Sequence, residues 1–422
     1  MSDNASRDCA RRAVFITPVL PSWNGMGLAM RAAVQLAGLA RTCDVTVILI
    51  PVIGAVSGYE RFSAAFPNTP LEVIGNQGEA DAYFTMISRL RDPAEQLLHF
   101  ARYGKPSLAA SVTGTVARQV ASCIERCGAS MVHVFRSYLA PAIDDVPGGV
   151  LRSIDLDEDD AASCLSVAGV RAASGQALAA RWASLEAAAF DMLLAQKLAS
   201  FRAITLANQE DVPRLSSRHP GLPLRPLPNC VAVPRLNAIA RGPRPAGMNI
   251  LFVGSLRYMP NIDGLIWFIR NVLPRISGAR LRIVGHARPP LLLAHARKGR
   301  VEFMGYVENL AIAYRNADLA IAPMRSGGGT RIKILEAGAH GVPVVASPQA
   351  AAGLWTTEPP WGLVADGAHR FALACRRLLE NPHEAMRLGS RGRHAVLLRH
   401  SCDRISNDWA KLFHEIQKES RA

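Results

Sequence analysis

The sequence predicts an α/β protein made of two doubly wound domains. Three observations support this prediction: the chain length, the alternation of short aliphatic runs with longer helical patterns, and a proline-rich break near the middle after which the alternation begins again. At 422 residues the chain is too long for one ordinary core, because domains usually contain about 100 to 200 residues. The hydrophobic content of 49% and the charged content of 19% argue against a disordered or fibrous protein.

The first half of the chain contains five predicted strands and two clear helices. The strands are expected at residues 13–17, 45–50, 71–74, 131–134 and 152–154, and the helices at residues 29–40 and 177–199. Alternating strands and helices connect by crossovers, which produce a parallel sheet. Pro18 and Pro21 interrupt the apolar run after Arg11 and Arg12, so we interpret it as the first strand and not as a secretory signal.

The pattern restarts after two segments rich in proline and glycine, residues 222–229 and 241–247, which indicate an interdomain connection. Strands are expected at residues 249–253, 280–284, 301–303, 319–322 and 342–345, and helices at residues 263–273, 310–315 and 330–339. Residues 370–416 read as helix without strands. No apolar run reaches the roughly 18 residues that a membrane-spanning helix needs.

The positive charge of the chain is concentrated in its second half. Residues 1–235 contain 22 Lys and Arg against 21 Asp and Glu, whereas residues 236–422 contain 26 against 13. The second half therefore carries nearly all of the net charge of +14. A field of this sign attracts anionic ligands such as nucleotides, phosphates, nucleic acid or acidic lipid.

The eight cysteines are scattered and predict neither a disulfide framework nor a metal site. They occupy positions 9, 43, 123, 127, 164, 230, 375 and 402, as expected for small buried hydrophobic residues in a reducing compartment. Cys123 and Cys127 are four residues apart on a predicted helix, but no second pair or histidine cluster accompanies them. We therefore expect no zinc site.

A glycine-rich turn before a helix is the strongest candidate for an anion site. Glycines 327–329 permit close approach of a ligand to the main chain, and Thr330 is a good N-cap for the helix that follows. The free N–H groups of a first helical turn carry a partial positive charge that suits a phosphate. Arg331 and Lys333 add full charges at the same end.

Helix geometry ranks these side chains. Lys333 and Glu336 lie about 60° apart on one face, and Arg331 lies about 140° from Glu336, so Lys333 is the stronger phosphate candidate. The alternative is a flexible turn followed by a surface pair of Lys333 and Glu336. The glycine spacing matches neither the P-loop nor the dinucleotide fingerprint, so spacing alone leaves both interpretations open.

Three stretches in order, residues 252–264, 301–307 and 325–347, resemble the C-terminal domain of family 4 (group 1) retaining glycosyltransferases with the GT-B fold. Residues 378–382 and 387–393 are similar to the tail of that family. The resemblance implies two Rossmann-like domains that face a central cleft. Residues 1–235 would form the acceptor-side domain, residues 236–385 the nucleotide-sugar donor domain, and residues 386–422 a helical tail that crosses back to the first domain.

The resemblance also implies site residues. Arg331 and Lys333 would be catalytic by stabilising the leaving diphosphate, Glu336 would bind the ribose, and the donor site would comprise Gly254, Ser255, Gly328, Gly329, Thr330, Arg331, Lys333 and Glu336. Gly25 and Gly27 resemble the loop that faces the acceptor and the donor phosphates, and His133 stands where the family often has a catalytic cleft histidine. The alternatives are a plain strand-to-helix turn for the two glycines and a buried core residue for His133.

The sequence departs from the family pattern at two places. The family commonly has a second glutamate eight residues before the ribose-binding one, and Gly328 occupies that position. Many relatives carry Arg and Lys in the loop after the first strand of the donor domain, where this chain has Ser255 and Pro260. Arg331 and Lys333 would supply the missing charge. Arg257 is an alternative phosphate ligand.

Asp155 and Asp157 suggest a metal site, because carboxylates two residues apart suit Mg²⁺. An Asp-x-Asp metal motif belongs to a different glycosyltransferase fold, however, and the GT-B resemblance implies no metal. A strand that presents both acids at one edge explains the pair equally well. We therefore expect neither a metal nor another cofactor.

We expect a retaining, metal-independent glycosyltransferase of the hexosyltransferase type that acts in polysaccharide or glycoconjugate biosynthesis. Its partners would be a nucleotide diphosphate sugar and a glycan, polyprenyl-linked or small-molecule acceptor, with weak peripheral contact to the inner face of the membrane and a cytoplasmic location. Two alternatives stay open: a nucleotide-sugar 2-epimerase of the same fold, and a nonenzymatic anion-binding homologue. Nucleic acid is not an expected partner, because aromatic residues make up only 6% of the chain.

Overall fold

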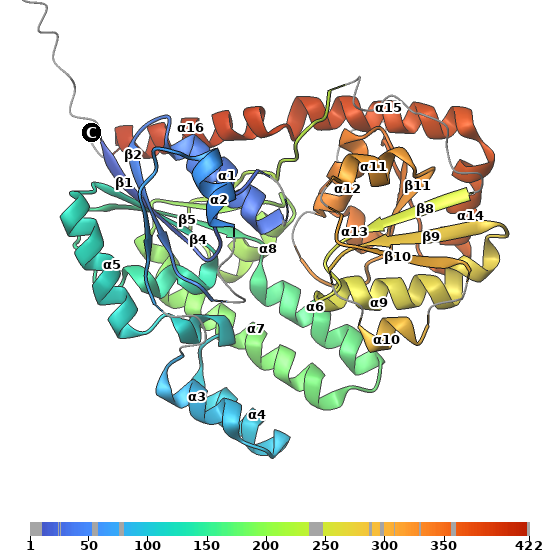
Figure 1. Ribbon diagram of the computed structural model, residues 1–422. Coiled ribbons are helices and arrows are strands. Elements are labelled where there is room, and N and C mark those ends of the chain that lie inside the picture. Colours follow the sequence, from blue (N-terminus) through green and yellow to red (C-terminus); the bar gives the residue numbers. More distant parts are fainter. Residues whose placement is uncertain are drawn as a thin grey trace, which may run out of the picture. The chain divides into compact units, whose positions relative to one another are not determined.

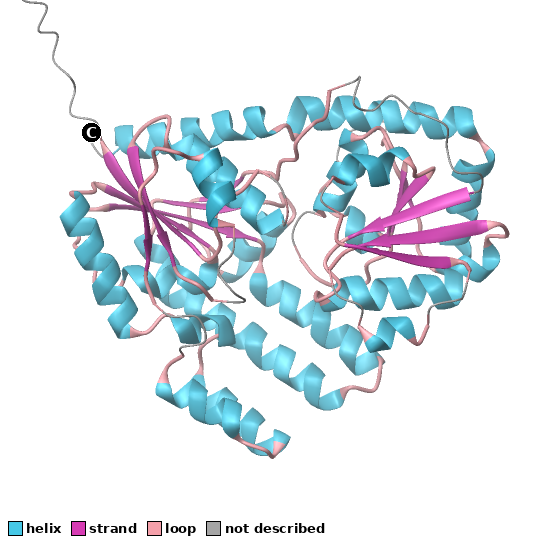
Figure 2. Ribbon diagram, viewed as in Figure 1, coloured by secondary structure: helices cyan, strands magenta, loops and turns pink. Residues whose placement is uncertain are grey.

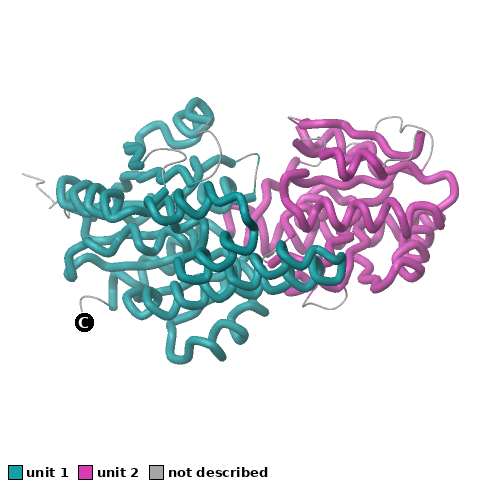
Figure 3. The backbone as a smooth tube through the Cα atoms, turned by 90° about the horizontal axis from the view of Figure 1, so that it is seen from below, with its two compact units in different colours: residues 1–228, 405–422 teal, residues 229–404 magenta. Residues whose placement is uncertain are grey.

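The computed structural model describes residues 11–419 except 24, 26, 53–57, 76–79, 236–247, 287–288, 296–298, 308, 329–330 and 356–359. The chain divides into two compact units, Met1–Pro228 with Ile405–Ala422, and Asn229–Arg404 (Figure 3). Each unit contains one β-sheet with helices on both faces (Figures 1 and 2). The predicted α/β class with two doubly wound sheets is therefore confirmed. Among the described residues, no helix combines the length and the apolar character needed to cross a membrane.

The first unit contains a seven-stranded parallel sheet in the order β3-β2-β1-β4-β5-β6-β7. Its strands are β1 Arg12–Thr17, β2 Asp44–Leu49, β3 Leu71–Val73, β4 Met131–Phe135, β5 Leu151–Asp157, β6 Ala203–Leu206 and β7 Leu224–Pro226. The five predicted strands are present, and β6 and β7 were not predicted. The proline-rich segment that was expected to be a connection contains β7. Proline is tolerated there because β7 is the edge strand and bonds to one neighbour.

The helices of the first unit are α1 Gly27–Leu39, α2 Tyr59–Ala65, α3 Ala82–Arg89, α4 Pro93–Tyr103, α5 Gly114–Cys127, α6 Asp160–Ala173, α7 Ala177–Lys197, α8 Asp211–Arg218 and, from its fourth residue, α16 Cys402–Glu419. Alternate residues of the strands point to opposite faces of the sheet. Val14 and Val132 on one face join a core with Val120 of α5 and Leu193 of α7. On the other face, rings of α16 pack on His133 of β4.

The second unit contains a six-stranded parallel sheet in the order β10-β9-β8-β11-β12-β13. The strands are β8 Met248–Val253, β9 Ala279–Val284, β10 Val301–Gly305, β11 Leu319–Ala322, β12 Val344–Ala346 and β13 Leu363–Val364. The helices are α9 Met259–Trp267, α10 Pro290–Leu293, α11 Leu310–Arg315, α12 Ile332–Ala339, α13 Pro348–Ala351, α14 Ala368–Glu380 and α15 Pro382–Arg399. Five strands were predicted, and the short edge strand β13 was not.

Two helices of the second unit begin at other residues than predicted. Helix α9 begins at Met259, four residues earlier, with Pro260 in its first turn, where a fixed φ favours helix and no N–H is needed. Helix α12 begins at Ile332, two residues later, and Arg331 occupies the N-cap position. The predicted cap, Thr330, lies outside the described residues.

The strand order of each sheet reverses at one point, between β1 and β4 in the first unit and between β8 and β11 in the second. In doubly wound sheets, ligands bind beyond the carboxyl ends of the strands at such a reversal. The loops that follow β8 and β11 contain Gly254, Ser255 and the glycine-rich stretch. The loops that follow β1 and β4 contain Gly25 and Arg136.

Candidate functional site

Lys333 is the central side chain of the candidate site in the second unit. It lies in the first turn of α12, and its Nζ donates a hydrogen bond of 2.6 Å to Oδ1 of Asn261 on α9. The same Nζ lies 4.1 Å from the ring centroid of Phe252 in β8, a cation–π contact. The ammonium group therefore sits over the carboxyl end of β8, between the two loops that border the reversal of the sheet.

Glycine is required where the backbone passes this ammonium group. A Cβ atom on Gly254 would lie 2.8 Å from Nδ2 of Asn261 and 3.0 Å from Nζ of Lys333. A Cβ atom on Gly285, which follows β9, would lie 2.1 Å from the carbonyl oxygen of Gly254. The two glycines let the ends of β8 and β9 approach each other and leave room for the lysine.

Burial lowers the fraction of Lys333 that is protonated at neutral pH. Loss of water around the amine, reinforced by the nearby charge of Arg331, lowers the pKa of Lys333 from its usual value to about 7. An ammonium group has three N–H donors, of which one is directed to Asn261 and a second, at 3.7 Å, to Sδ of Met324. A phosphate near Gly254 would use the third donor, replace the weak sulfur contact and restore a pKa that favours the charged form.

Glu336 follows Lys333 by one turn of α12 and does not form an ion pair with it, so the surface pair of the alternative interpretation is absent from this described part of the chain. Its Oε2 accepts a hydrogen bond of 3.2 Å from the hydroxyl of Tyr314 on α11, whose ring stacks on His340. Burial raises the pKa of Glu336 to about 7. The free oxygen of the carboxylate can accept hydroxyl donors such as those of a ribose.

The side chain of Arg331 lies against the backbone of the glycine-rich loop. Its guanidinium group donates to the carbonyl oxygens of Gly327, at 2.5 Å, and Gly328, so it braces the glycine-rich loop from within. The side chain is buried, and its Nε has no hydrogen-bond partner. Arg331 occupies the N-cap position, where the chain has not yet entered the helix, and in this conformation it holds the loop. Its predicted role at a diphosphate stays a prediction.

Within the described part of the loop, the backbone at Gly327 requires a glycine. Its φ of +91° lies in the left-handed region, and a Cβ atom would approach the hydroxyl oxygen of Tyr258 to 2.5 Å. Its carbonyl oxygen also accepts a hydrogen bond of 2.8 Å from Gln349. Gly329 and Thr330, which were predicted to bind the donor, lie outside the described residues.

Three other predicted or alternative donor residues lie in or near these loops. Ser255 is exposed, and its hydroxyl accepts a hydrogen bond of 3.3 Å from the amide of Arg257, whose side chain is exposed as well. Pro260 is buried in the first turn of α9. Ser255 and Pro260 provide no positive charge, so the buried cations of the described part of these loops are Lys333 and Arg331, and Arg331 is directed to backbone carbonyl oxygens.

Sequence reasoning missed several residues of the site. Asn261 and Tyr314 fix Lys333 and Glu336 but carry no sequence signal beyond the family stretch that includes Asn261. His286 and Tyr306, after β9 and β10, form an exposed stacked pair with ring centroids 4.7 Å apart. Flat exposed rings at the carboxyl edge of a sheet can stack on a nucleobase.

In the first unit, Gly25 and Gly27 lie in the loop after β1. Gly25 is exposed with a φ of +108° and open space around its Cα, and Gly27 is the first residue of α1. The geometry fits both the ligand loop and the plain strand-to-helix turn. The role predicted for Gly25 and Gly27 therefore remains untested.

His133 does not fit the cleft role that the resemblance implied. It is buried in β4, its Nε2 donates to Oε1 of Gln35 at 2.9 Å, and its Nδ1 pairs with the hydroxyl of Ser153 at 2.9 Å. Burial lowers the pKa of His133 to about 3, so the imidazole is neutral. The rings of Trp409 and Phe413 cover it from α16. The side chain points into the core because of its position in the alternation of β4.

Asp155 and Asp157 are both held by arginines. Asp155 is fully buried and accepts two hydrogen bonds, at 2.6 and 2.7 Å, from the guanidinium of Arg31 on α1. Asp157 pairs with Arg136 at 3.0 Å. Arg136 and Asp157 are the two non-glycine residues with positive φ in the described chain, at 84° and 66°. The acids therefore anchor the ends of β4 and β5 through ion pairs.

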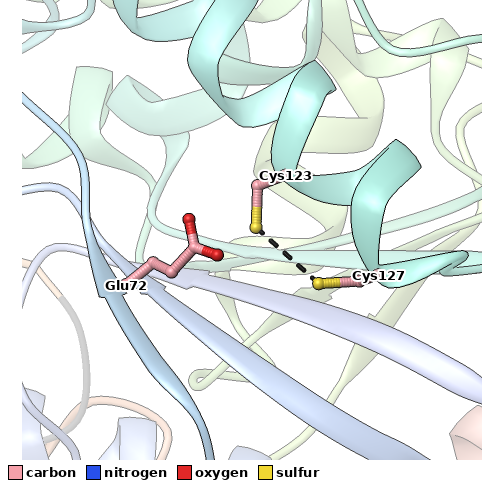
Figure 4. Close-up of side chains that lie close together, drawn as sticks. All are labelled: Glu72, Cys123 and Cys127. Atoms are coloured by element: carbon pink, nitrogen blue, oxygen red, sulfur yellow. Dashed lines mark hydrogen bonds between the residues drawn. The ribbon is translucent and has the colours of Figure 1, made fainter.

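One group of described side chains brings three potential metal ligands together. The carboxylate of Glu72 on β3 and the thiols of Cys123 and Cys127 on α5 place one ligand atom each within 4.8 Å of one another (Figure 4). The carboxylate is already bound by Arg126, with both oxygens at 2.8 to 2.9 Å. Burial, the largest cause, raises the pKa of Cys123 to about 12, which disfavours the thiolate that a metal requires. The group belongs to the first unit, whereas Lys333 belongs to the second.

Similar structures identify the class of this fold. Sucrose-phosphate synthase from Thermosynechococcus elongatus is 17% identical and matches with a TM-score of 0.67, over 97% of this chain and 100% of that one. A TarM mutant from S. aureus, in complex with Fondaparinux, alpha-GlcNAc-glycerol and UDP, is 9% identical with a TM-score of 0.67 over 96% and 99%. HepE from Anabaena, in complex with UDP-glucose, is 14% identical with a TM-score of 0.63 over 96% and 99%. No curated protein sequence matches the chain significantly.

The chain thus has the GT-B fold of glycosyltransferases, with two parallel sheets of the Rossmann type. The family model described as "Glycosyl transferases group 1" matches residues 247–381, which include β8, β11 and α12. The second unit therefore carries a group 1 glycosyl transferase domain, and the predicted resemblance to that group is confirmed.

Proposed function

We propose that this protein transfers a sugar from a nucleotide diphosphate sugar to a glycan, lipid-linked or small-molecule acceptor, with retention of the anomeric configuration and without a metal ion. The observation that carries the proposal is the placement of Lys333. A buried ammonium group over the end of β8, next to two glycines that permit close approach, is an arrangement that suits a diphosphate. The group 1 domain covers all of these residues.

In this proposal the leaving diphosphate gains negative charge as the glycosidic bond to the sugar breaks. Lys333 would stabilise that charge from a preorganised position, which can lower a barrier by several kcal/mol. Asn261 and Phe252 hold the ammonium group in place before the substrate arrives. Arg331 would act indirectly, by fixing the carbonyl oxygens of the loop after β11.

The same proposal assigns the nucleoside end of the donor to two further groups. Glu336 would accept hydrogen bonds from the ribose, because its carboxylate has one oxygen without a bond to Tyr314. The exposed rings of His286 and Tyr306 would border the base. UDP is the first ligand to test, because UDP or UDP-glucose is bound in the similar TarM and HepE structures.

The test is donor binding by Lys333→Ala and Glu336→Ala variants. Each should weaken binding of UDP or of the preferred nucleotide sugar by about tenfold or more, about 1.4 kcal/mol or more, as measured by calorimetry. Arg376→Ala removes an exposed arginine of α14 and serves as the matched control, with unchanged affinity expected. Wild-type affinity in both site variants would refute the assignment.

Product analysis distinguishes the proposal from its nearest rival. Transfer gives a glycosylated acceptor and a free nucleotide diphosphate, and it should persist in EDTA if no metal takes part. A nucleotide-sugar 2-epimerase would instead release an epimerised nucleotide sugar or its free sugar without needing an acceptor. A chain that binds UDP but forms no product with any donor and acceptor pair would be a nonenzymatic homologue.

A further inference from the structure

A second pair of thiols lies where the chain passes between its two units. The passages occur after Pro228 and after Arg404. Cys230 follows the first passage closely, and Cys402 precedes the second. Their Sγ atoms are 3.2 Å apart, which is closer than the 3.9 Å between Cys123 and Cys127 on α5. Both cysteines belong to the second unit, at its two ends.

Main-chain bonds hold these two segments side by side. Val231 and Ser401 form a parallel β-bridge, and the amide of Val231 donates to the carbonyl oxygen of His400 at 2.9 Å. Nδ1 of His400 donates in turn to the carbonyl oxygen of Asn229 at 2.9 Å. The residues next to each cysteine are therefore fixed to the opposite segment, which holds the two sulfurs 3.2 Å apart.

Arg393 on α15 reinforces the same contact. Its Nη2 donates to the carbonyl oxygen of Pro234 at 2.6 Å, and its Nη1 donates to the carbonyl oxygen of Ala339 at 2.5 Å, at the end of α12. The first passage is thus fastened to the body of the second unit at Pro234 as well as at Val231. A cross-link at Cys230 would join segments that are already ordered against each other.

We propose that Cys230 and Cys402 form a redox-active dithiol, which a low-molecular-weight disulfide oxidises to an intramolecular disulfide that ties together the two ends of the second unit. The proposal rests on the geometry of the two segments and does not depend on the proposed glycosyl transfer.

The chemistry follows from the surroundings of the two sulfurs. Cys402 is partly exposed and Cys230 is buried, so an oxidant reaches Cys402 first. The hydrogen bond with Cys230 lowers the pKa of Cys402, which increases its thiolate fraction. At Cys123, in contrast, burial raises the thiol pKa to about 12. The two pairs should therefore react at different rates.

The reaction is a pair of thiol–disulfide exchanges. The Cys402 thiolate attacks one sulfur of the oxidant, forms a mixed disulfide and releases the first small thiolate. Cys230 then loses its proton, its sulfur attacks Sγ of Cys402, and the second small thiolate leaves. Overall, two protein thiols lose two electrons and two protons, and the oxidant is reduced to two thiols. The sulfurs close from 3.2 Å to the bond length of about 2.0 Å.

The test is oxidation of the full-length protein by oxidised glutathione, followed by acid quenching, alkylation of free thiols and peptide mapping by mass spectrometry. The Cys230–Cys402 cross-link should form about tenfold or more faster than any bond between Cys123 and Cys127, since its sulfurs lie closer together, the pKa of Cys402 is lowered and that of Cys123 is raised. Cys230→Ser should accumulate the glutathione adduct on Cys402, and Cys402→Ser should leave Cys230 unmodified.

Three results would overturn the proposal: earlier cross-linking of Cys123 and Cys127, a stable glutathione adduct on wild-type Cys402 without the cross-link, or no reaction at either cysteine. A further supporting result concerns stability, because a bond between the ends of the second unit restricts its unfolded chain. The oxidised protein should melt at a higher temperature than the reduced one. Cys123→Ser should keep this difference, and Cys402→Ser should remove it.

Discussion

Lys333 and Glu336 both titrate close to neutral pH, at about 7, because both are buried at the start of α12. Their effects on donor binding have opposite signs. A diphosphate needs the protonated amine, whose population falls as pH rises through 7. A ribose hydroxyl needs the ionised carboxylate, whose population rises in the same range. The wild-type profile therefore combines two opposing slopes.

The Glu336→Gln variant should show the part of the pH dependence of UDP binding that comes from Lys333 alone. Without the carboxylate, UDP affinity should fall as pH increases from about 6 to about 8, approaching tenfold per pH unit above the lysine pKa. Calorimetry in two buffers of different ionisation enthalpy should also detect proton uptake near pH 7, since a bound phosphate raises the lysine pKa. The double variant with Lys333→Ala removes the amine and should show neither effect. A pH profile shared by both variants would contradict the assignment.

Gly254 should matter more for binding than for folding. Alanine at this position would push against the side-chain ends of Asn261 and Lys333, at 2.8 and 3.0 Å, which can move aside. We expect Gly254→Ala to reduce UDP affinity by about tenfold, because displacement of a positioned group by a fraction of an ångström is costly. The free energy of unfolding should change by about 1 kcal/mol or less. Loss of stability with intact binding would show that the glycine serves only the packing of β8 and β9.

The packing of α16 against α1 within the first unit can be tested by a single substitution. A Cβ atom on Gly38 of α1 would lie 2.4 Å from Cβ of Trp409 and 3.0 Å from the carbonyl oxygen of Ser406, and neither atom can rotate away. Gly38→Ala should therefore force the two helices apart and lower the free energy of unfolding by about 1–3 kcal/mol, measured by urea denaturation.

The matched control is Gly169→Ala in α6, where nothing lies within 4 Å of the added methyl group. This change should raise the stability by about 0.5–1 kcal/mol through helix propensity alone. Equal effects of the two substitutions would mean that α16 is not packed closely on α1. Faster proteolysis of α16 in Gly38→Ala alone would support the close contact.

The elements that could be predicted are those whose pattern is local. Central strands such as β1 and β8 are continuous aliphatic runs, and the glycine-rich stretch before α12 signals a turn without any knowledge of the fold. Strand β7 was not predicted because Pro226 within it and Pro223 just before it suggest a loop, and only its pairing with β6 makes it a strand. The burial of His133 could not be predicted with the same success, because the sequence does not show that Gln35 and Trp409 contact it in the fold.

The candidate site shows the same limit. Lys333 was predicted from helix geometry, and its contact with Asn261 depends on a residue 72 positions away. Arg331 was expected to face a ligand, because a sequence does not show that the helix begins one residue after it. Long-range partners decide which of two neighbouring cations is free to bind, and they are set by the fold.

The two units of the molecule have separate cores and carry different sets of predicted residues. Gly25 and His133 belong to the first unit, and Gly254, Lys333 and Glu336 belong to the second. The positive charge also resides in the half of the sequence that contains the second unit. Donor binding and the packing of α16 should therefore respond to different substitutions, although both units belong to one chain.

Hydrogen–deuterium exchange can test this separation. UDP should slow amide exchange in residues 254–261 and 323–336, because a ligand that binds only the folded state suppresses local opening by RT ln(1 + [L]/Kd), about 2.7 kcal/mol at a hundredfold excess over the dissociation constant. Protection of amides in β4 and α16 should stay unchanged. Gly38→Ala should give the reverse pattern, with faster exchange in α1 and α16 and unchanged protection by UDP. If the nucleotide instead protected mainly the first unit, the donor site would have to be moved there, and Lys333 would be left as a buried structural amine.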